Sequence, residues 1–554
     1  MSWLRSTPPG LLLAVLITLL RLLVIDIDPP VRDLTDYLPK DEGFYVFPAY
    51  DLYERGDAFV DHPFRLTGIP TITNVGAYLG LVVFGDNYLG LRFGSVLFAL
   101  ISLLCFHSLL ARITTDRLLL NILPLIMVSD LSFGFASILV EPTIARMAMM
   151  LVTMLWLDRI LRPTPNTIGL FMHGAGSALL VLLTYPTNAF VLPACWLAIA
   201  MITFQAEGGY KRSLRAVSSH VVGVVSGITL LLGLIWLLGY NELAQTAVTG
   251  KNFEHRVSLS PSGLFLDLYS MVQANIFRLN PALLLIFLGS AFFLFRRPVR
   301  RWSPALIIVA AFTIVFFAQT AFINDYPTRK LVILLPLALL VIAGSFEHSL
   351  EADPRSVRGR WIGWTLALIL ITGLLGQILL YHKNASFLSA QVSPALLPGI
   401  VIALVVVALL LFRRAMEPAS WWNARWVLCF LLVPGTWNSV RSMIIEREYA
   451  YADFMHSLRS YDGAVFIGAA SMGFRTYNDI VPRLNPYVLP GGYNDQWPVL
   501  ERMAIEDTTT NYAVGYLDDM VEFQRIGFHE DRITVLNIWE TMHENVFVVY
   551  KEKR

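Results

Sequence analysis

Long apolar runs separated by short polar connections make up the chain as far as about residue 445. A helix that crosses a membrane needs roughly 20 mostly apolar residues, which is the length of these runs. They predict an all-α polytopic membrane domain over residues 1–445, with about thirteen transmembrane helices. The predicted spans are 9–28, 89–111, 117–136, 139–160, 167–185, 187–204, 218–239, 281–296, 304–323, 329–347, 361–381, 396–412 and 423–443.

Basic residues cluster in every second connection between these runs. Because cytoplasmic loops are enriched in Lys and Arg, we place the basic connections inside and the N-terminus in the cytoplasm. No small-residue cleavage site follows the first apolar run, which we therefore expect to remain as an uncleaved span. The prediction is a multi-pass protein of the cell (inner) membrane whose first external loop covers residues 28–88. The basic connections contain Arg112 and Arg117; Arg159 and Arg162; Lys211, Arg212 and Arg215; Arg296, Arg297, Arg300 and Arg301; Arg355, Arg358 and Arg360; Arg413 and Arg414.

The pattern changes after residue 445, where short alternating segments replace the long apolar runs. Alternation of apolar and polar residues is typical of half-buried strands, and helix-like stretches lie between or before these segments. Residues 446–554 therefore predict a small C-terminal α/β domain, periplasmic or extracellular in the orientation given above. The predicted strands are 460–469, 511–517 and 544–551, and the predicted helices are 449–459, 497–506 and 518–526.

Composition supports the membrane assignment and excludes other classes of function. The 554 residues are 56% hydrophobic and only 15% charged, with a mean hydropathy of +0.59, whereas soluble domains carry about 25% charged residues. A net charge of +1 and the absence of a basic run argue against nucleic-acid binding. Cys105, Cys195 and Cys429 all fall in apolar spans, so we expect neither disulfides nor a thiolate metal site.

An acidic and aromatic stretch, YLPKDEGFYVFPAYDLYERGDAF at 37–59, follows directly after the first span. It is either a solvated external loop or a catalytic loop that lies on the membrane surface. A second acid, Glu141, stands at the outer start of the fourth span, five residues before Arg146. Carboxylates are costly at this depth, so Glu141 is either a functional group or an interfacial acid paired with Arg146.

The order of several motifs resembles that of the lipid-linked-sugar glycosyltransferases of the GT-C superfamily. The branch with the protein O-mannosyltransferases and the lipid A aminoarabinose transferase is the most similar. The chain differs from parts of this branch in carrying Glu at 141 where many relatives have Asp, and His62-Pro63-Phe64 in place of a Lys-Pro-Pro element. The matching motifs are Asp41-Glu42 with YDLYERGDAF after it, FGDNYLGLRFGSVL, Glu141, LLTYPTNAFVLPACW at 182–196 and YPTRKLVILLPLALLVIAG at 326–344.

The resemblance implies a GT-C-like fold and an inverting transfer of a sugar from a polyprenyl-phosphate carrier to an acceptor hydroxyl on the outer face. Asp41 is our first candidate for the base that deprotonates this hydroxyl, Glu42 is the second, and Glu141 completes the catalytic set. Arg329, with Lys330 and Tyr326, is expected to bind the donor phosphate, although basic residues at span ends also simply reach toward lipid headgroups. Candidates for further donor or acceptor contacts are Lys251, His255, Arg256 and His62.

The expected partners are a polyprenyl-phosphate-linked sugar donor, the lipid bilayer and an envelope acceptor, which is a glycolipid such as lipopolysaccharide, a polysaccharide or a protein. No metal is assigned and no cofactor is required, although Asp41, Glu42 and Glu141 offer the oxygen ligands that Mg²⁺ or Mn²⁺ prefers. Two alternatives remain open, a transporter or lipid flippase and a non-catalytic subunit of an envelope-polymer assembly. A transporter would be expected to show repeated halves, and the sequence has no internal repeat.

Overall fold

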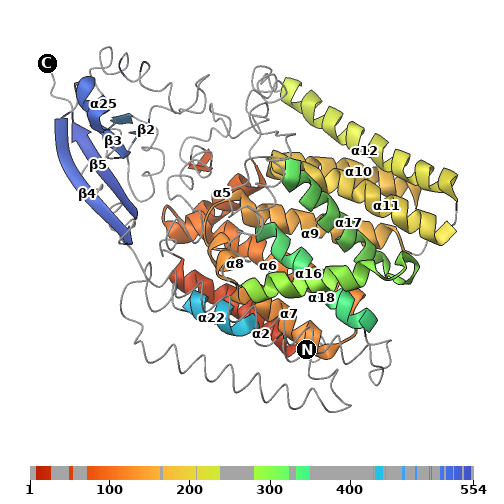
Figure 1. The fold of residues 1–554 in the computed structure, drawn as a ribbon. Helices are drawn as coiled ribbons and strands as arrows, with labels where there is room; N and C mark the ends of the chain where they lie inside the picture. Colours follow the sequence, from red (N-terminus) through yellow and green to blue (C-terminus); the bar gives the residue numbers. More distant parts are fainter. Residues whose placement is uncertain are drawn as a thin grey trace, which may run out of the picture.

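The structure is a computed structural model. Its helices pack into one bundle except for the short helix Met520–Arg525, which lies beside the strands at the C-terminal end of the chain (Figure 1). Its description covers residues 8–25, 49–50, 52–53, 71–162, 166–207, 209–237, 280–322, 332–349, 428, 431–440, 443, 465–467, 481–482, 498, 501, 512–516, 520–527, 529–539 and 542–550.

Most described helices coincide with the predicted apolar spans. Within the described residues, four are long and apolar enough to cross a membrane: Tyr88–Ile113, Thr167–Thr184, Asn188–Ala206 and Tyr210–Leu234. The helices are α2 (Pro9–Leu20), η1 (Arg21–Val24), α5 (Ile72–Phe84), α6 (Tyr88–Ile113), α7 (Arg117–Ser129), α8 (Leu131–Ala136), α9 (Pro142–Ile160), α10 (Thr167–Thr184), η2 (Pro186–Phe190), α11 (Val191–Glu207), α12 (Tyr210–Leu237), α16 (Pro281–Phe295), η3 (Val299–Arg301), α17 (Pro304–Phe322), α18 (Leu334–Ser349), α22 (Leu432–Val440) and α25 (Met520–Arg525).

Two predictions about these helices need correction or completion. Helix α12 begins at Tyr210 and not at residue 218, so Lys211, Arg212 and Arg215 lie on its first turns and not in a loop. Lys and Arg are good helix formers, and their long side chains let a helix continue past the apolar layer. The predicted spans 361–381 and 396–412 lie outside the described residues, and the total of thirteen spans stays a prediction.

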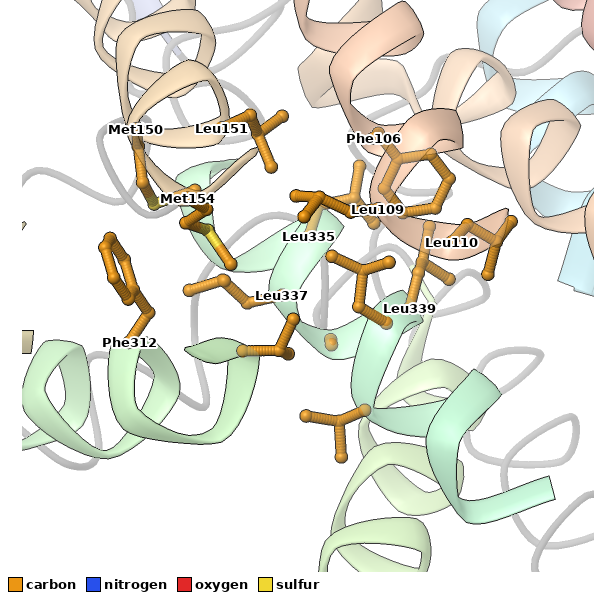
Figure 2. Packing of buried hydrophobic residues seen from close by; sticks show 14 of the residues in the cluster. Phe106, Leu109, Leu110, Met150, Leu151, Met154, Phe312, Leu335, Leu337 and Leu339 are labelled. Carbon is orange, nitrogen blue, oxygen red and sulfur yellow. The ribbon is translucent and has the colours of Figure 1, made fainter. Parts of the chain in front are cut away.

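The core of the bundle is built from aliphatic and aromatic side chains of α6, α9, α17 and α18. Figure 2 shows these side chains turned toward one another from helices that are far apart in the sequence. Lipid is as apolar as leucine, so dispersion contacts in close packing hold such helices together. The labelled core residues are Phe106, Leu109, Leu110, Met150, Leu151, Met154, Phe312, Leu335, Leu337 and Leu339.

Glycines allow two helix pairs to approach especially closely. A Cβ atom at Gly80 of α5 would lie 1.9 Å from the carbonyl oxygen of Gly90 in α6, and one at Gly94 would lie 2.5 Å from the carbonyl carbon of Gly76. Each helix therefore contributes a Gly-x-x-x-Gly motif to an antiparallel pair without a side chain in between. The turn between them contains Gly85 with φ of 79°, a conformation that favours glycine.

Helices α10 and α12 pack by the same device. A Cβ atom at Gly174 would lie 2.2 Å from the carbonyl oxygen of His220, and one at Gly223 would lie 2.1 Å from that of Phe171. Gly223 and Gly227 again have the spacing of a Gly-x-x-x-Gly motif. This approach places histidines of the two helices side by side, as described below.

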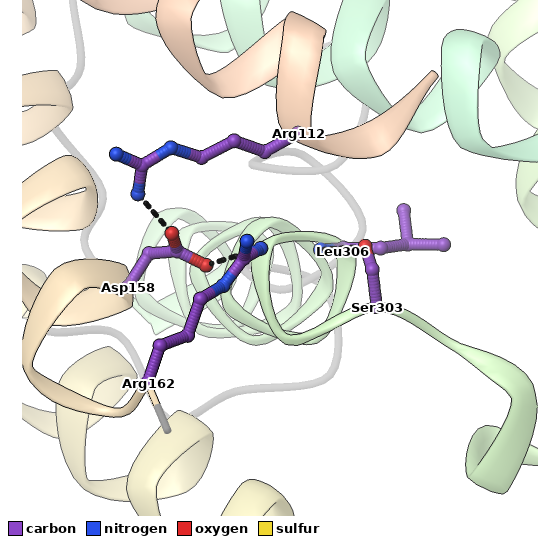
Figure 3. A network of polar contacts seen from close by, with 5 residues as sticks. All are labelled: Arg112, Asp158, Arg162, Ser303 and Leu306. Carbon is purple, nitrogen blue, oxygen red and sulfur yellow. Dashed lines mark hydrogen bonds and ion pairs between the residues drawn. The ribbon is translucent and has the colours of Figure 1, made fainter. Parts of the chain in front are cut away.

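An ion-pair cluster ties together the ends of α6 and α9 that the sequence predicts to be cytoplasmic. The buried carboxylate of Asp158 accepts from Arg112, and its other oxygen lies 3.1 Å from the guanidinium of Arg162 (Figure 3). At the same end, the hydroxyl of Thr114 donates to Glu347 at 2.6 Å. The loop charges assign these helix ends to one side of the membrane. The contacts place the same ends next to one another. Which side is cytoplasmic stays a prediction.

Five strands form one mixed sheet in the order β2-β1-β3-β5-β4. Strand β1 pairs in parallel with β2 and β3, whereas β5 pairs antiparallel with β3 and β4. Strands β1, β3 and most of β5 fall in the three segments predicted as strands, and the sequence predicted neither β2 nor β4. The boundary of a C-terminal domain at residue 446 stays a prediction. The strands are β1 (Val465–Ile467), β2 (Val481–Pro482), β3 (Tyr512–Tyr516), β4 (His529–Trp539) and β5 (Met542–Tyr550).

Candidate functional site

Glu141 lies at the other end of α9 from the Asp158 ion-pair cluster. It is the N-cap residue of this helix, with Pro142 in the first turn, and only 3% of its surface is exposed. The positive end of the helix dipole favours a carboxylate at this position. Among the residues predicted to form the site, Glu141 is the one that the structure describes, and it is buried within the protein.

A tyrosine from the first external loop shares a buried cluster with the residue before Glu141. Tyr50 is 1% exposed and belongs to a buried cluster that also contains Tyr88 and Val140, the residue before Glu141. The hydroxyl of Tyr50 donates to the carboxylate oxygen Oδ1 of Asp86 at 2.7 Å. Asp86 lies in the turn between α5 and α6, so one hydrogen bond joins the acidic and aromatic stretch at 37–59 to this helix pair.

Arg146, one turn further along α9, is fully buried and directed toward the 185–188 turn. Its Nε atom donates to Oδ1 of Asn188 at 3.0 Å, and its guanidinium lies 5.7 Å from the ring centroid of Tyr185. Tyr185 in turn packs against the cluster that contains Tyr50. The turn YPTN therefore joins the same end of the bundle as Glu141 and contributes an amide and an aromatic ring.

Two further arginines at this end bind backbone carbonyls of neighbouring helices. Arg21 donates to the carbonyl of Val128 and, at 2.8 Å, to the hydroxyl of Ser137, while Arg92 donates to the carbonyl of Ile25 at 2.6 Å. The sequence left Glu141 and lipid as the two partners of Arg21. Both are wrong, because Arg21 is 4% exposed and satisfies carbonyl groups that a helix end leaves free.

The remaining site predictions fall outside the described residues, so their positions are not tested. Of the three carboxylates predicted to be able to hold Mg²⁺ or Mn²⁺, only Glu141 is described. These site residues outside the description are Asp41, Glu42, His62, Lys251, His255, Arg256, Tyr326, Arg329 and Lys330.

One group of potential metal ligands occurs among the described residues, in the interior of the bundle. The ligand atoms of His173, Cys195 and His220 lie within 4.8 Å of one another, and all three residues are buried. They come from α10, α11 and α12. The sequence predicted no thiolate metal site, and the hydrogen bonds of these side chains decide whether a metal ion fits among them.

The hydrogen bonds assign a role to every ring nitrogen of the two histidines. Trp196 donates from Nε1 to Nδ1 of His220 at 3.1 Å, so Nε2 of His220 carries the proton and donates to Nδ1 of His173, 2.9 Å away. Nε2 of His173 then donates to the carbonyl of Thr153 at 3.1 Å. Indole donates only and a carbonyl accepts only, which fixes both tautomers.

This chain of hydrogen bonds does not fit a metal ion. A histidine ligand uses the lone pair of one nitrogen and donates a hydrogen bond from the other. The nitrogen of His220 that faces away from His173 meets the indole donor of Trp196, so it cannot be the donor. The cluster is therefore a hydrogen-bonded connection between α9, α10, α11 and α12.

A partial signal for this cluster is present in the sequence. His173 and His220 each lie inside a predicted span, and ionisable residues there are functional or structural candidates by default. Their proximity, however, depends on how α10 and α12 rotate about their axes, which no spacing within one helix reveals. The hydrogen bond between Tyr50 and Asp86 is hidden for the same reason, since its partners lie on different elements.

Comparison with known proteins adds a likeness of fold. No protein-family profile matches the chain, and no curated protein matches it significantly. The crystal structure of ArnT from Cupriavidus metallidurans bound to undecaprenyl phosphate matches with a TM-score of 0.61 and 14% identity, over 97% of each chain. The apo structure of the same protein matches with a TM-score of 0.60, the same identity and the same coverage. The likeness confirms, at the level of fold, the resemblance to the lipid A aminoarabinose transferase.

Proposed function

We propose that the protein is a glycosyltransferase that moves a sugar from a polyprenyl-phosphate carrier to a hydroxyl group of an envelope acceptor on the outer face of the membrane. The observation that carries this proposal is the fold, which is shared over 97% of both chains with a protein crystallised with undecaprenyl phosphate. The order of the sequence motifs and the burial of Glu141 at the predicted outer end support it.

The reaction requires a base, a leaving group and a cation. The donor lipid supplies the leaving group, and the chain has candidates for the base and the cation. Asp41, or Glu42 in its place, takes the proton of the acceptor hydroxyl as the acceptor oxygen bonds to the anomeric carbon. The bond from this carbon to the phosphate oxygen breaks with inversion, and its electron pair leaves with the polyprenyl phosphate. Arg329, with Lys330 and Tyr326, neutralises the charge that grows on the phosphate.

Glu141 is the third acidic residue of the proposed site. Its buried position at the start of α9 places a carboxyl group at the end of the bundle, where it can orient sugar hydroxyls or help to hold a divalent cation. Mg²⁺ or Mn²⁺ bound there with Asp41 and Glu42 would supply further neutralisation of phosphate charge. His62, Lys251, His255 and Arg256 are proposed to contact the donor or the acceptor.

Binding of undecaprenyl phosphate tests the donor half of the proposal. We expect this lipid to raise the thermal stability of the purified protein in nanodiscs, because a ligand that binds only the folded state stabilises it. Undecaprenol, which lacks the phosphate, should have a much smaller effect. Arg329→Gln should weaken the response at least tenfold in lipid concentration, and Arg525→Gln, on the exposed helix α25, should not.

The donor half is contradicted if undecaprenyl phosphate and undecaprenol stabilise the wild-type protein equally. It is also contradicted if Arg329→Gln leaves the response unchanged, since the phosphate is then bound elsewhere. A transporter or flippase of the same lipid would bind it without transferring sugar. The transfer measurement at the end of the Discussion separates these functions.

A further inference from the structure

A hydrogen bond between Tyr50 and Asp86 joins two of the sequence motifs, YDLYERGDAF and FGDNYLGLRFGSVL. Tyr50 belongs to the acidic and aromatic stretch of the first external loop, and Asp86 to the turn between α5 and α6. The hydroxyl of Tyr50 donates to Asp86 at 2.7 Å, and Tyr50 is 1% exposed. A hydrogen bond to an ionised carboxylate is shorter and stronger than one between neutral groups.

Tyr50 shares a buried cluster with apolar residues from three parts of the chain. Ala77 and Leu81 come from α5, Leu91 comes from α6, and Val140 precedes Glu141. The buried cluster thus places this point of the first loop between the α5–α6 pair and the start of α9. Because Val140 precedes Glu141 in the chain, the cluster that contains Tyr50 extends to the residue beside Glu141.

The α5–α6 pair is a rigid support for this contact. Its helices meet through glycines without intervening side chains, and Asn87 caps α6 by accepting from the backbone N–H of Gly90 at 2.9 Å. The side chain of Asn87 also donates to the carbonyl of Phe84 at 2.8 Å. The two hydrogen bonds of Asn87 therefore connect the turn that contains Asp86 to the end of α5 and to the start of α6.

We propose that Tyr50 and Asp86 are positioning residues of the transfer reaction, which fix the first external loop beside Glu141. This inference rests on the proposed function. Asp41 precedes Tyr50 by nine residues, so the chain between them spans at most about 30 Å. The hydrogen bond therefore ties the segment that carries the candidate base to the turn between α5 and α6.

The expected effect on catalysis follows from geometry. A catalytic group misplaced by about 1 Å can cost on the order of 100-fold in rate. Removal of the hydroxyl in Tyr50→Phe keeps the ring in its apolar cluster but releases the loop from Asp86. The variant should therefore remain folded, lose turnover and keep its affinity for the donor lipid, whose phosphate is assigned to Arg329.

The experiment measures sugar transfer by the full-length protein with material from a strain that lacks its gene. A lipid extract of that strain serves as the donor source, and its envelope fraction serves as the acceptor. We expect Tyr50→Phe and Asp86→Ala each to lower the apparent kcat by about 10- to 100-fold, with the apparent KM for the extract within about threefold of wild type. The double variant should be no slower than the slower single variant, because both changes break one contact.

Tyr53→Phe is the matched control, because Tyr53 lies in the same stretch but is 39% exposed. It should keep wild-type turnover. If the wild-type protein transfers sugar and Tyr50→Phe has a kcat within threefold of it, the positioning role is refuted. Additive losses in the double variant, or a kcat that falls only as the amount of folded protein falls, refute it as well.

Failure of the proposed function gives a different result in this experiment from failure of the positioning role alone. In that case the wild-type protein itself transfers no sugar from the extract, and the positioning role falls with the proposed function. Activity of the wild-type protein with full activity of Tyr50→Phe leaves the proposed function standing and overturns only the inference about this contact.

Discussion

Buried arginines at the end of the bundle that contains Glu141 show how single residues are accommodated in an apolar interior. Arg21 donates to the carbonyl of Val128, in the last turn of α7, and Arg92 donates to that of Ile25, at the end of η1. The last carbonyls of a helix lack partners within it and carry partial negative charge. Each arginine therefore serves as a cap that its neighbouring helix does not supply.

The two buried histidines are also accommodated in the apolar interior through hydrogen bonds, here between neutral groups. Both rings of His173 and His220 are buried, and each nitrogen has a partner of the opposite kind. A buried polar group that loses its partner costs about 1–3 kcal/mol, although such bonds between membrane helices are worth about 0.6 kcal/mol on average. The histidines thus contribute a specific connection between helices and only modest stability.

We predict that His220→Phe lowers the free energy of unfolding by about 1–2 kcal/mol, because it leaves the indole of Trp196 and one nitrogen of His173 without partners. Thermal unfolding of the detergent-solubilised protein measures this change. His107→Phe is the control, because Nδ1 of His107 has no hydrogen bond within the described part of the chain. Zn²⁺ should not stabilise the wild-type protein. Stabilisation by Zn²⁺ that disappears in Cys195→Ala would show instead that the cluster is a metal site.

At the scale of helices, close packing through glycine determines which pairs can form. Helices α10 and α12 approach so closely that a methyl group at Gly223 would overlap the backbone at Phe171. The neighbourhood of Gly233, further along α12, is open, with nothing within 4 Å of an added Cβ atom. Substitution of alanine for glycine at these two positions therefore separates the effect of helix packing on stability from the effect of helix propensity.

We predict that Gly223→Ala destabilises the protein by about 1–3 kcal/mol, because the helices must move apart to admit the methyl group. Gly233→Ala should be neutral or stabilising by up to about 1 kcal/mol, because alanine favours a helix over glycine. Thermal unfolding of the two variants side by side is the measurement. Equal behaviour of both variants would contradict the close approach of α10 and α12.

The limits of these helices could largely be predicted from the sequence, for a physical reason. An apolar layer of fixed thickness demands apolar runs of a fixed length, so α6 (Tyr88–Ile113) and α10 (Thr167–Thr184) closely match the predicted spans. Outside the layer this constraint ends, and α12 begins earlier than predicted because its basic residues continue the helix. Helix α5, with 13 residues, is too short to cross the layer and was not counted as a span.

For the molecule as a whole, the charge pattern of the loops agrees with contacts that the sequence alone could not show. Arg112 and Arg162, predicted on one side, meet at Asp158 (Figure 3). At the other ends of the same helices, the first loop meets the start of α9 through Tyr50 and Val140. The sequence could predict the side of each loop but not the pairing, because pairing depends on helix rotation and order in three dimensions.

The candidate site was predicted from an ordered set of motifs, and the structure places one of its residues. Glu141 is buried at the start of α9, and its role in the site stays a prediction. The predictions for Asp41, Glu42 and Arg329 depend on the resemblance in sequence and on the likeness of fold at 14% identity. The transfer reaction proposed above rests on the order of the motifs together with this likeness of fold.

Mass spectrometry of envelope glycolipids and lipid-linked sugars from a deletion strain tests the central claim most directly. The strain should lack one sugar modification and accumulate the corresponding polyprenyl-phosphate sugar. The wild-type gene should restore both, whereas Asp41→Asn, made in equal amount and inserted in the membrane, should restore neither. An envelope and a lipid-linked pool that are unchanged by the deletion would contradict the proposed function. Full restoration by Asp41→Asn and also by Glu42→Gln would contradict the assignment of the base.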